Sequence, residues 1–482
     1  MVEYNQLEAI FKGLDITGLC CDSRKIRPGD AFVAINGGSY DGNNFIDAAI
    51  ESGAKVVITD NLAIASSNFD NKIIYVANAR IALSRLAGIV YPKLPEYLIA
   101  VTGTNGKTSI VSYCRQLYTL LNQRAASIGT IGVECDFIEQ QLHSQQTLTT
   151  PDPIILRSVL HNLVENNINY VAFEASSHGL DQERLCGIKV NAAAFSSFSQ
   201  DHLDYHKTMD SYLTAKLKLF KSNLLADSIA VISSEIERLD YIKDFLAQNN
   251  VNFLTIGARG DVLINSIKSS MINQEVTFAY KGAKYNFNTE IIGDFQSSNL
   301  LIAAFLVHNT GFAIEDIVAQ LPKVKAVLGR LERVTNNKHP YHIFVDYAHT
   351  PDALKNSLNE LRKIKSTNGR LKVLFGCGGN RDSSKRGLMG AIASKLADEV
   401  IITDDNPRKE NPDQIRREIL QTALGAIEIP GRQEAITKVI SELQRDDILL
   451  IAGKGHENYQ IIGDTIIEFN DTSIATKVLE NL

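Results

Sequence analysis

Short runs of apolar residues alternate along the chain with longer stretches in which apolar residues recur every three or four positions. The short runs are typical of buried strands, and the longer stretches are typical of helices that bury one face. Strands that alternate with helices form mainly parallel sheets, so the pattern predicts an α/β fold. Strands are predicted at 55–60, 72–77, 97–103, 168–177, 228–234, 341–349, 371–379, 399–405 and 447–456.

The pattern is interrupted at two places. The segment 91–97, YPKLPEY, contains two prolines and is predicted to be a linker. A second boundary is predicted near 324–334, after the apolar helical segment at 297–312. Because 482 residues are too many for one core, we predict three domains, at 1–94, 95–327 and 328–482.

Composition narrows the class of protein. A hydrophobic content of 44%, a charged content of 22% and a net charge of −6 fit an ordinary protein without the basic surface of a nucleic-acid binder. No apolar run approaches a membrane span, and the first residues lack the apolar core of a signal peptide. The 6 cysteines have no zinc or redox spacing, which is typical of reduced thiols. We therefore expect a cytoplasmic protein whose partners are small molecules, with no nucleic acid and no membrane span.

The segment GTNGKT at 103–108 follows a predicted strand and precedes a helical pattern. This order predicts a phosphate-binding loop, although the loop is two residues shorter than the usual G-x-x-x-x-G-K-[ST]. Its backbone N–H groups and the helix N-terminus would hold phosphate oxygens of ATP. Lys107 would contact the terminal phosphates and the Thr108 hydroxyl would hold Mg²⁺. The predicted ATP-binding residues of the loop are Gly103, Thr104, Asn105, Gly106, Lys107 and Thr108.

Three further segments of the central region carry polar residues that are candidates for the site. Glu174 ends a predicted strand, where a carboxylate suits Mg²⁺. The segment DHLDYH at 201–206 is, by itself, more typical of a solvated loop than of a metal site. Lys216 and Lys218 are, by themselves, typical of the exposed face of an amphipathic helix.

Taken together, GTNGKT, TLTTPDP (147–153), EASSHGL (174–180), DHLDYH and YLTAKLKLF (212–220) resemble the Mur ligase family. Members of this family form amide bonds in bacterial cell-wall precursors and in folate polyglutamate, and they share the short loop. The resemblance implies a central P-loop domain, a C-terminal Rossmann-like domain, ATP as co-substrate and Mg²⁺ as cofactor. It implies that ATP phosphorylates a substrate carboxylate and that an amine then displaces phosphate from the acyl phosphate.

The resemblance also implies roles for individual residues. Lys216 matches a carbamoylated lysine (N6-carboxylysine), which would make it an anionic metal ligand. The implied catalytic residues are Lys107, Glu174, His202 and Lys216, and the implied metal ligands are Thr108, Glu174, His202 and Lys216. Further ATP contacts are implied for Asn299, Arg330, Asp346 and His349.

The N-terminal segment at 21–54 resembles the uridine-nucleotide domain of the tripeptide-forming members. The matched contacts to the UDP-muramoyl-peptide are Ser23, Arg24, Thr149, Thr150, Ser176, Gln182 and Arg184. Four positions depart from the family pattern, namely Asn43, Gln200, Asn380 and Gly387. No role is assigned to Asn43, and the consequences of the other three departures are left open.

The segment TDDNPRKENP at 403–412 contains residues that are expected to bind the second substrate, an amino acid. Asn406 precedes a proline and is therefore extended, and Arg408 offers a planar fork that can grip a carboxylate. Meso-diaminopimelate is lysine with an additional carboxylate, so an arginine facing that end favours it over L-lysine. Family members that add diaminopimelate carry D-N-P-R here. The residues matched to this substrate are Arg381, Asp405, Asn406, Pro407, Arg408, Gly453 and Glu457.

The leading interpretation is therefore a monomeric ATP-dependent ligase that adds diaminopimelate to a UDP-muramoyl-dipeptide. The nearest alternative is the same ligase using L-lysine. A more distant alternative is a P-loop phosphotransferase or switch protein, which would hydrolyse ATP or GTP without an amino acid. A nucleotide-binding regulator with a decayed site is disfavoured because the lysine, glutamate and histidine positions are all filled.

Overall fold

The computed structural model describes residues 1–37, 40–66, 72–138, 148–334 and 339–482. Thr147, in the 147–153 motif, and residues 38–39, in the predicted uridine-nucleotide segment, lie outside these ranges. The chain is mixed α/β with mostly parallel sheets, as predicted, and each of the nine predicted strands is present. In the described ranges no helix is both long enough and apolar enough to cross a membrane.

The N-terminal part is a four-stranded parallel sheet in the order β1-β2-β3-β4. Strands β2 and β3 are buried along their whole length, which is why they read as continuous apolar runs. The elements are α1 (Tyr4–Gly13), β1 (Leu19–Cys20), η1 (Ser23–Lys25), β2 (Ala31–Ala34), η2 (Gly42–Phe45), α2 (Ile46–Glu51), β3 (Val56–Thr59), α3 (Leu62–Ser66), β4 (Ile73–Tyr75) and α4 (Ala79–Val90).

The central part is built on a ten-stranded sheet in the order β14-β13-β12-β11-β10-β9-β5-β8-β6-β7. Its first half comprises β5 (Tyr97–Thr102), α5 (Lys107–Leu120), β6 (Ala125–Gly129), β7 (Gly132–Cys135), α6 (Pro153–Glu165), β8 (Tyr170–Glu174), α7 (Ser177–Asp181), β9 (Val190–Phe195), α8 (Leu203–His206) and α9 (Met209–Lys218). Its second half comprises η3 (Leu219–Asn223), β10 (Leu224–Ser233), α10 (Leu239–Gln248), β11 (Asn252–Gly257), β12 (Val262–Ser269), β13 (Gln274–Tyr280), β14 (Ala283–Thr289), α11 (Asp294–His308), α12 (Ile314–Val318) and η4 (Leu321–Lys323).

The C-terminal part is a six-stranded sheet in the order β15-β16-β20-β17-β18-β19, with only β15 antiparallel to its neighbour, and a separate hairpin of β21 and β22. Its strands are β15 (Glu332–Arg333), β16 (His342–Asp346), β17 (Leu371–Phe375), β18 (Glu399–Ile402), β19 (Ile427–Glu428), β20 (Ile448–Ala452), β21 (Tyr459–Ile462) and β22 (Thr465–Glu468). Its helices are α13 (Pro351–Ile364), α14 (Lys385–Leu396), α15 (Pro412–Leu420), α16 (Arg432–Ser441) and α17 (Asp471–Glu480).

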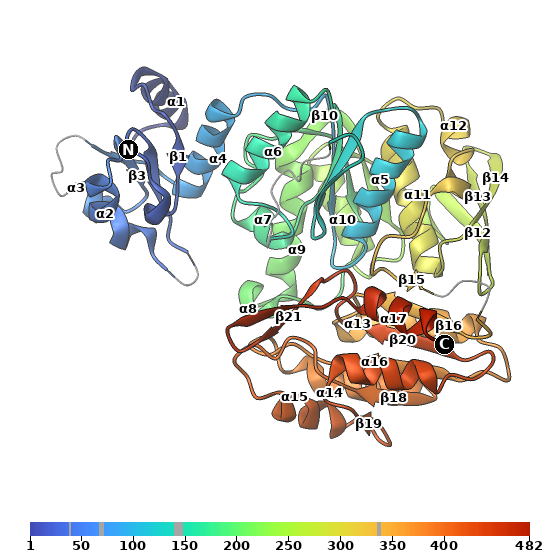
Figure 1. Cartoon of the computed structure of the whole chain (residues 1–482). Helices are drawn as coiled ribbons and strands as arrows, with labels where there is room; N and C mark the ends of the chain where they lie inside the picture. Colours follow the sequence, from blue (N-terminus) through green and yellow to red (C-terminus); the bar gives the residue numbers. More distant parts are fainter. Residues whose placement is uncertain (38–39, 67–71, 139–147, 335–338) are drawn as a thin grey trace.

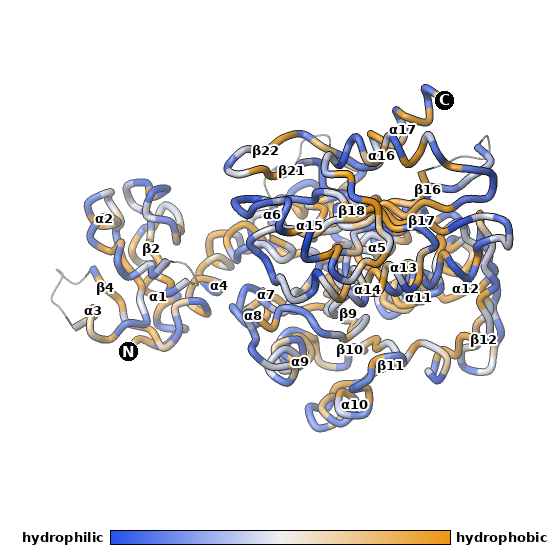
Figure 2. The backbone as a smooth tube through the Cα atoms, turned by 90° about the horizontal axis from the view of Figure 1, so that it is seen from below, coloured by the Kyte–Doolittle hydropathy of each residue, from blue (hydrophilic) through white to orange (hydrophobic). Residues whose placement is uncertain are grey.

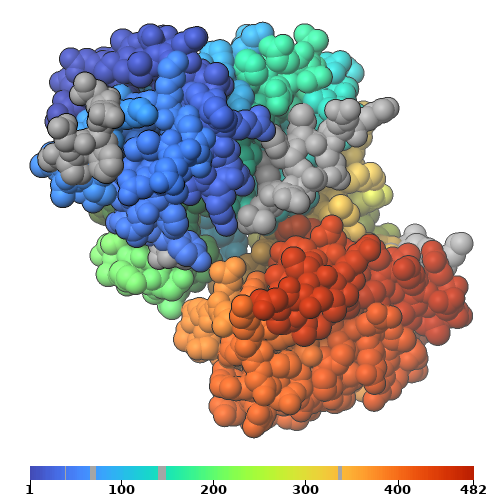
Figure 3. Space-filling view, turned by 60° about the vertical axis from the view of Figure 1, so that its left-hand side comes forward, coloured from blue at the N-terminus to red at the C-terminus, as the bar shows by residue number. Residues whose placement is uncertain are grey.

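The three parts are arranged around the central sheet. The N-terminal part lies to one side and the C-terminal part lies below the central part (Figure 1). A space-filling view shows the N-terminal and C-terminal lobes separated on one face by a recess (Figure 3). Apolar positions gather on the strands of the C-terminal sheet, most clearly on β17 and β18 (Figure 2). Because the carboxyl ends of parallel strands meet at one edge of a sheet, this arrangement brings loops that are distant in sequence into one site.

Candidate active site

The phosphate loop joins β5 to α5 and is held open by two glycines. Gly103 has φ 146° and Gly106 has φ 87°, conformations that side chains rarely adopt. A Cβ on Gly103 would lie 2.0 Å from the Ser196 hydroxyl, and one on Gly106 would lie 2.7 Å from Asn299 Oδ1. The loop therefore has no room for larger residues, and Asn299 of α11, a predicted ATP contact, lies directly against it.

Two lysine ammonium groups converge on one carbonyl of this loop. Lys107 Nζ donates to the carbonyls of Gly103 and Thr104, at 2.9 Å each. Lys216 Nζ, from α9, donates to the same Gly103 carbonyl at 2.7 Å. Desolvation lowers the pKa of Lys107. Burial, followed by the nearby Lys107 charge, lowers the pKa of Lys216 well below its usual value.

The surroundings of Lys216 differ from the exposed helix face that its own sequence context suggested. Its side chain is 1% exposed, and Nζ lies 4.3 Å from the centre of the Tyr212 ring. In the described ranges no carboxylate lies within 4.0 Å of this ammonium group. Lys218, by contrast, is partly exposed and pairs with Asp181 and Glu183, as expected for the helix surface.

Glu174 ends β8 beside the loop and is 1% exposed. One carboxylate oxygen accepts from the Thr130 N–H at 2.8 Å, and the other accepts from the Thr130 hydroxyl at 3.3 Å. Its negative charge acts on the Lys107 ammonium group. The carboxylate is therefore fixed in place next to the cationic loop.

The predicted magnesium ligands lie on separate elements around the phosphate loop. Among the described side chains, no three His, Cys, Asp or Glu residues are grouped closely enough to hold a metal ion. Thr108 and Glu174 offer oxygen atoms, whereas an unmodified Lys216 offers only an ammonium or amine. Mg²⁺ prefers oxygen ligands, so Thr108 and Glu174 suit it. The full magnesium site, with His202 and a carbamate on Lys216, stays a prediction.

His202, the fourth predicted ligand, begins α8 with a left-handed backbone, φ 53°. Its ring lies 4.8 Å from the ring of His178, and Nε2 is 3.5 Å from Asp201 Oδ2. Burial lowers the pKa of His202 to about 4 even though Asp201 opposes the shift. The imidazole is therefore neutral at neutral pH, which is the form that can bind a metal.

Side chains of the C-terminal part and of the segment before it reach the phosphate loop. Arg330 donates from Nη2 to the Thr108 hydroxyl at 2.9 Å, and its guanidinium lies 4.5 Å from the centre of the Tyr347 ring. Asn105 Nδ2 donates to Asp352 Oδ2 on α13 at 3.3 Å. Contacts between the C-terminal part and the nucleotide loop therefore exist in this structure.

The other two predicted ATP contacts are Asp346, the last residue of β16, and His349, which follows the strand. Asp346 is buried and accepts from the Ser357 hydroxyl, and its burial raises the pKa of its carboxyl group. His349 Nδ1 lies 2.9 Å from the Tyr347 carbonyl. Desolvation lowers the pKa of His349 to about 4.

Most residues matched to the muramoyl-peptide are linked by hydrogen bonds around the carboxyl end of β8 and the short helix α7. The Thr150 hydroxyl donates to the Glu174 carbonyl at 2.8 Å and lies 3.0 Å from the Ser176 hydroxyl. Arg184 donates to the Thr150 carbonyl at 2.5 Å and to Gln182 Oε1 at 2.7 Å. Thr149 accepts from the Thr130 hydroxyl at 3.2 Å, which links this cluster to the shell around Glu174.

Ser23 and Arg24 are in the N-terminal part, on η1, away from this cluster in the chain. The Arg24 side chain is 86% exposed and forms a two-point pair with Asp22, with Nε and Nη2 each at 2.9 Å from a carboxylate oxygen. Its uridine-nucleotide contact stays a prediction.

The residues matched to the amino acid follow three adjacent parallel strands, β20, β17 and β18. Arg408 Nη1 donates to the Gly379 carbonyl at 3.0 Å, so the loops after β18 and β17 meet there. A Cβ on Gly378 would lie 2.8 Å from this Nη1 and 3.9 Å from Arg381 Cγ. Over the described ranges, neither Arg408 nor Arg381 has a carboxylate within 4.0 Å.

Asn406 and Glu457 join the loops after β18 and β20. Asn406 Nδ2 donates to Glu457 Oε2 at 2.9 Å. Asp405 lies two residues before Pro407, and its Oδ1 accepts from the Asn406 N–H at 2.6 Å. A Cβ on Gly453 would lie 2.8 Å from Asp405 Oδ2. The structure thus brings these residues and Arg408 together at one edge of the sheet.

One departure from the family pattern, Asn380, links two loops of the amino-acid region. Asn380 has φ 52°, its N–H donates to Glu410 Oε2 at 2.9 Å, and its Oδ1 accepts from the Lys409 N–H at 3.1 Å. Glu410 is in turn paired with the buried Arg386. Asn380 therefore ties the loop that bears Arg381 to the loop that bears Arg408.

Lys454 was not predicted from the sequence. It is fully buried, and Nζ donates to Glu457 Oε2 at 2.9 Å and to Asn406 Oδ1 at 3.1 Å. The only available signal was its position between two glycines near the carboxyl end of the predicted strand at 447–456.

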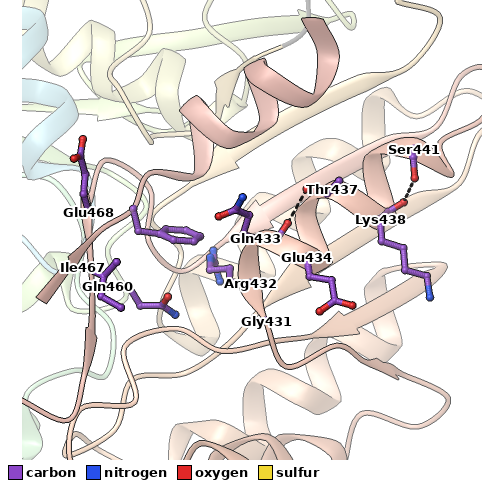
Figure 4. Close-up of a pocket in the computed structure, with 11 residues that line it drawn as sticks. Gly431, Arg432, Gln433, Glu434, Thr437, Lys438, Ser441, Gln460, Ile467 and Glu468 are labelled. Atoms are coloured by element: carbon purple, nitrogen blue, oxygen red, sulfur yellow. Dashed lines mark hydrogen bonds between the residues drawn. The ribbon is translucent and has the colours of Figure 1, made fainter. Parts of the chain in front are cut away.

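A hollow of about 830 Å³ lies elsewhere on the C-terminal part, between α16, β21 and β22 (Figure 4). None of the predicted ATP or amino-acid residues lines it. Gln460, which lines the hollow, links it to the charged loops, because its side chain donates to the Asp405 carbonyl at 2.6 Å. The predicted sites therefore lie where the loops meet, and not in this hollow.

Fold and geometry together define a nucleotide-binding α/β protein with a cationic phosphate loop on one sheet and a separate charged site on another. Three family matches cover most of the chain, as Mur ligase family, catalytic domain (15–98), Mur ligase middle domain (101–307) and Mur ligase, glutamate ligase domain (329–455). The chain belongs to the Mur ligase family. The resemblance inferred from the motifs is confirmed.

Named relatives are similar over the full chain. The UDP-N-acetylmuramoyl-L-alanyl-D-glutamate–2,6-diaminopimelate ligase of Rickettsia rickettsii is 51% identical over 99% of this chain and 98% of its own. The protein of the same name from Bradyrhizobium diazoefficiens is 42% identical over 96% of this chain and 95% of its own. A solved structure of a ligase with this name is 32% identical, with a TM-score of 0.68, and covers 97% of this chain and 95% of its own.

A more distant structure shares the fold alone. It is the folylpolyglutamate synthase of Mycobacterium tuberculosis in complex with ADP. It is 16% identical, with a TM-score of 0.63, over 78% of this chain and 91% of its own.

Proposed function

We propose that this chain is an ATP-dependent ligase that adds meso-2,6-diaminopimelate to UDP-N-acetylmuramoyl-L-alanyl-D-glutamate in peptidoglycan precursor synthesis. The terminal phosphate of ATP passes to the D-glutamate carboxylate and forms an acyl phosphate. An amine of diaminopimelate attacks the acyl carbon, phosphate leaves, and the amine loses a proton as the amide forms. Relatives of this name at 42% and 51% identity support this activity.

The observation that carries the choice of amino acid is the charge arrangement at Arg408. This half-buried guanidinium and Arg381 have no carboxylate within 4.0 Å in the described ranges, and Glu457 lies on the neighbouring loop. A substrate end that bears both a carboxylate and an ammonium complements this pair of charges. L-Lysine has only the ammonium at that end, so its use would leave the two arginines without an anion.

At the nucleotide end, the loop residues 103–108, Lys107 and Arg330 would bind and orient the phosphates, with Asn299, Asp346 and His349 nearby. Mg²⁺, bound by Thr108, Glu174, His202 and the carbamate of Lys216, would neutralise charge between the polyphosphate and the substrate carboxylate. The carbamate forms when the neutral Lys216 amine adds to the carbon of CO₂ and releases a proton. Its lowered pKa favours that neutral form.

We also infer the setting of the reaction. The domain boundaries are 1–94 for uridine-nucleotide binding, 95–327 for ATP and 328–482 for the amino acid. Ser23, Arg24 and the cluster around Thr150 would hold the UDP-muramoyl-dipeptide. The enzyme would be a cytoplasmic monomer whose partners are its small-molecule substrates.

The experiment is phosphate release from ATP in the presence of the UDP-muramoyl-dipeptide, with meso-diaminopimelate or L-lysine added in parallel. Release with diaminopimelate alone is the expected result. Equal release with both amino acids would keep the ligase and overturn the specificity argument. Release of phosphate from ATP alone, without either substrate, would instead support the alternative of a P-loop hydrolase.

A further inference from the structure

Lys454 occupies an unusual position for a lysine. The loop after β20 turns sharply on both sides of it, with φ 110° at Gly453 and φ 54° at Gly455, and its side chain is 0% exposed. The ammonium group lies 5.6 Å from the centre of the Tyr459 ring and 5.9 Å from the centre of the Phe469 ring. The charge is therefore held inside the C-terminal part and cannot reach water.

A buried ammonium group is stable only with close partners. Glu457 is the one carboxylate within 4.0 Å of Lys454 Nζ in the part of the chain that the structure describes. Arg432 also acts on Glu457 electrostatically, but its Nε and Nη2 donate to Asp471 at 2.8 and 2.7 Å. Arg432 is thus committed elsewhere, and Lys454 supplies the direct contact to Glu457.

The contacts of Glu457 are all on one side of its carboxylate. Oε2 accepts from Lys454 Nζ and from Asn406 Nδ2, at 2.9 Å each. Asn406 is itself fixed, because its Oδ1 accepts from Lys454 Nζ at 3.1 Å and from the Ile461 N–H at 2.9 Å. Oε1 accepts no hydrogen bond from the described residues, so it is left available for a ligand.

We propose that Lys454 is a positioning residue for the amino-acid substrate. It engages Oε2 and holds the Asn406 amide in one orientation, so that Oε1 of Glu457 faces the distal ammonium of the substrate. This inference rests on the proposed function and deepens it, because it assigns recognition of the distal ammonium to a three-residue unit of Lys454, Asn406 and Glu457. The side chain of Asn406 serves inside this unit and not as a separate ligand contact.

The test compares two amino acids that differ only at the distal amine, meso-diaminopimelate and 2-aminopimelate, which lacks it. Each is measured as a substrate or as a competitive inhibitor, with wild type, Lys454→Met, Glu457→Gln and the double variant. For Lys454→Met we expect KM for diaminopimelate to rise about 10- to 50-fold, as for loss of a buried charge partner. The KM or inhibition constant for 2-aminopimelate, and the KM for ATP, should stay within about threefold of the wild-type values.

Because the two residues act as one unit, the double variant should be no worse than the Glu457→Gln variant. Lys454→Arg, which keeps the charge, should recover part of the affinity for diaminopimelate. Lys372→Met is the matched control, since Lys372 is a buried lysine on β17 paired with Glu399 at 3.2 Å and lies outside the proposed site. Its discrimination between the two amino acids should equal that of wild type.

Equal losses for diaminopimelate and 2-aminopimelate in Lys454→Met would overturn the inference, as would additive losses in the double variant. Failure of Lys454→Met to fold leaves Lys454→Arg and Glu457→Gln to decide, and unchanged discrimination in Glu457→Gln would then overturn it. A wild-type protein that does not use diaminopimelate would instead refute the proposed function, so the two failures are distinguishable.

Discussion

Two buried lysines, one in the phosphate-loop region and one in the C-terminal part, have opposite electrostatic environments. Lys216 is 1% exposed and donates to the backbone carbonyl of Gly103, beside a second cation, Lys107. Lys454 is 0% exposed and donates to a carboxylate and an amide oxygen. The two lysine side chains are buried to the same extent, and only their hydrogen-bond and charge partners differ.

The difference teaches what each lysine can do. An ammonium without an anion in a dry site gives up its proton easily, and the neutral amine that results can react with CO₂. A lysine that donates to a carboxylate and an amide oxygen holds those neighbours in place. The first region therefore suits chemistry on the lysine itself, and the second suits recognition.

The largest expected effect tests the reactive lysine. Lys216→Ala should reduce ligation by about 10²–10³-fold, because an anionic group that stabilises the reaction is lost. Added formate or acetate should restore part of the rate by supplying a carboxylate in the vacated space. Lys218→Ala is the matched control on the same helix and should retain near wild-type turnover. Unchanged turnover of Lys216→Ala would contradict a reactive role for Lys216, and with it the functional difference from Lys454.

The next effect concerns the recognition region. Arg408→Ala should raise KM for diaminopimelate by about 10²-fold, since a charge partner of the substrate carboxylate is lost. KM for ATP should change little, because Arg408 lies on the loop after β18, away from the phosphate loop. Lys409→Ala, which removes an exposed lysine paired with Asp464, is the control. Equal changes in both KM values would contradict a carboxylate-gripping role.

Stability measurements should show the contrast directly. Replacing Lys216 by Met removes a buried lysine whose lowered pKa reduces stability. The free energy of unfolding should therefore rise by about 1–2 kcal/mol at pH 7, measured by urea denaturation in CO₂-free buffer. Replacing Lys454 by Met leaves the Glu457 carboxylate without its cation and should lower it by about 1–3 kcal/mol. Changes of the same sign would show that burial, and not the partner, decides the effect.

The pH dependence of the Lys216 contribution follows from its lowered pKa. The folded state binds fewer protons at Lys216 than the unfolded state below the ordinary lysine value of about 10.4, so this group lowers stability more as pH falls from that value toward the folded-state pKa. The gain from Lys216→Met should therefore be larger at pH 7 than at pH 9. A gain that does not vary with pH would contradict the shift.

The smallest effect is expected at a charge pair in water. Arg24 is 86% exposed and its pair with Asp22 is accessible to solvent, so Arg24→Ala should leave the melting temperature unchanged. If Arg24 contacts the uridine nucleotide, KM for the UDP-muramoyl-dipeptide should rise by about fivefold or less, with KM for diaminopimelate constant. A large loss of stability would mean that exposure does not screen this pair.

Several strands were missed by the sequence analysis for physical reasons. Strand β9, VNAAAF, is rich in alanine, which has a low strand propensity, and it forms because β5 and β10 pair with it on both sides. Strands β12, β13 and β14 extend the central sheet as an antiparallel meander with partly exposed faces, so they lack the continuous apolar runs of the parallel core.

The sequence by itself determined the features that are contiguous in the chain. The nine strands predicted from continuous apolar runs, the glycine-dependent phosphate loop between β5 and α5, and the motifs of the Mur ligase family could be read locally, because strand, turn and helix there follow one another directly. Only the tertiary structure decided which of Lys216 and Lys218 is buried, that Asn380 links two loops, and that Lys454 meets Glu457 and Asn406. These contacts join strands that are distant in sequence but adjacent in the sheet, and burial and pairing are properties of that packing.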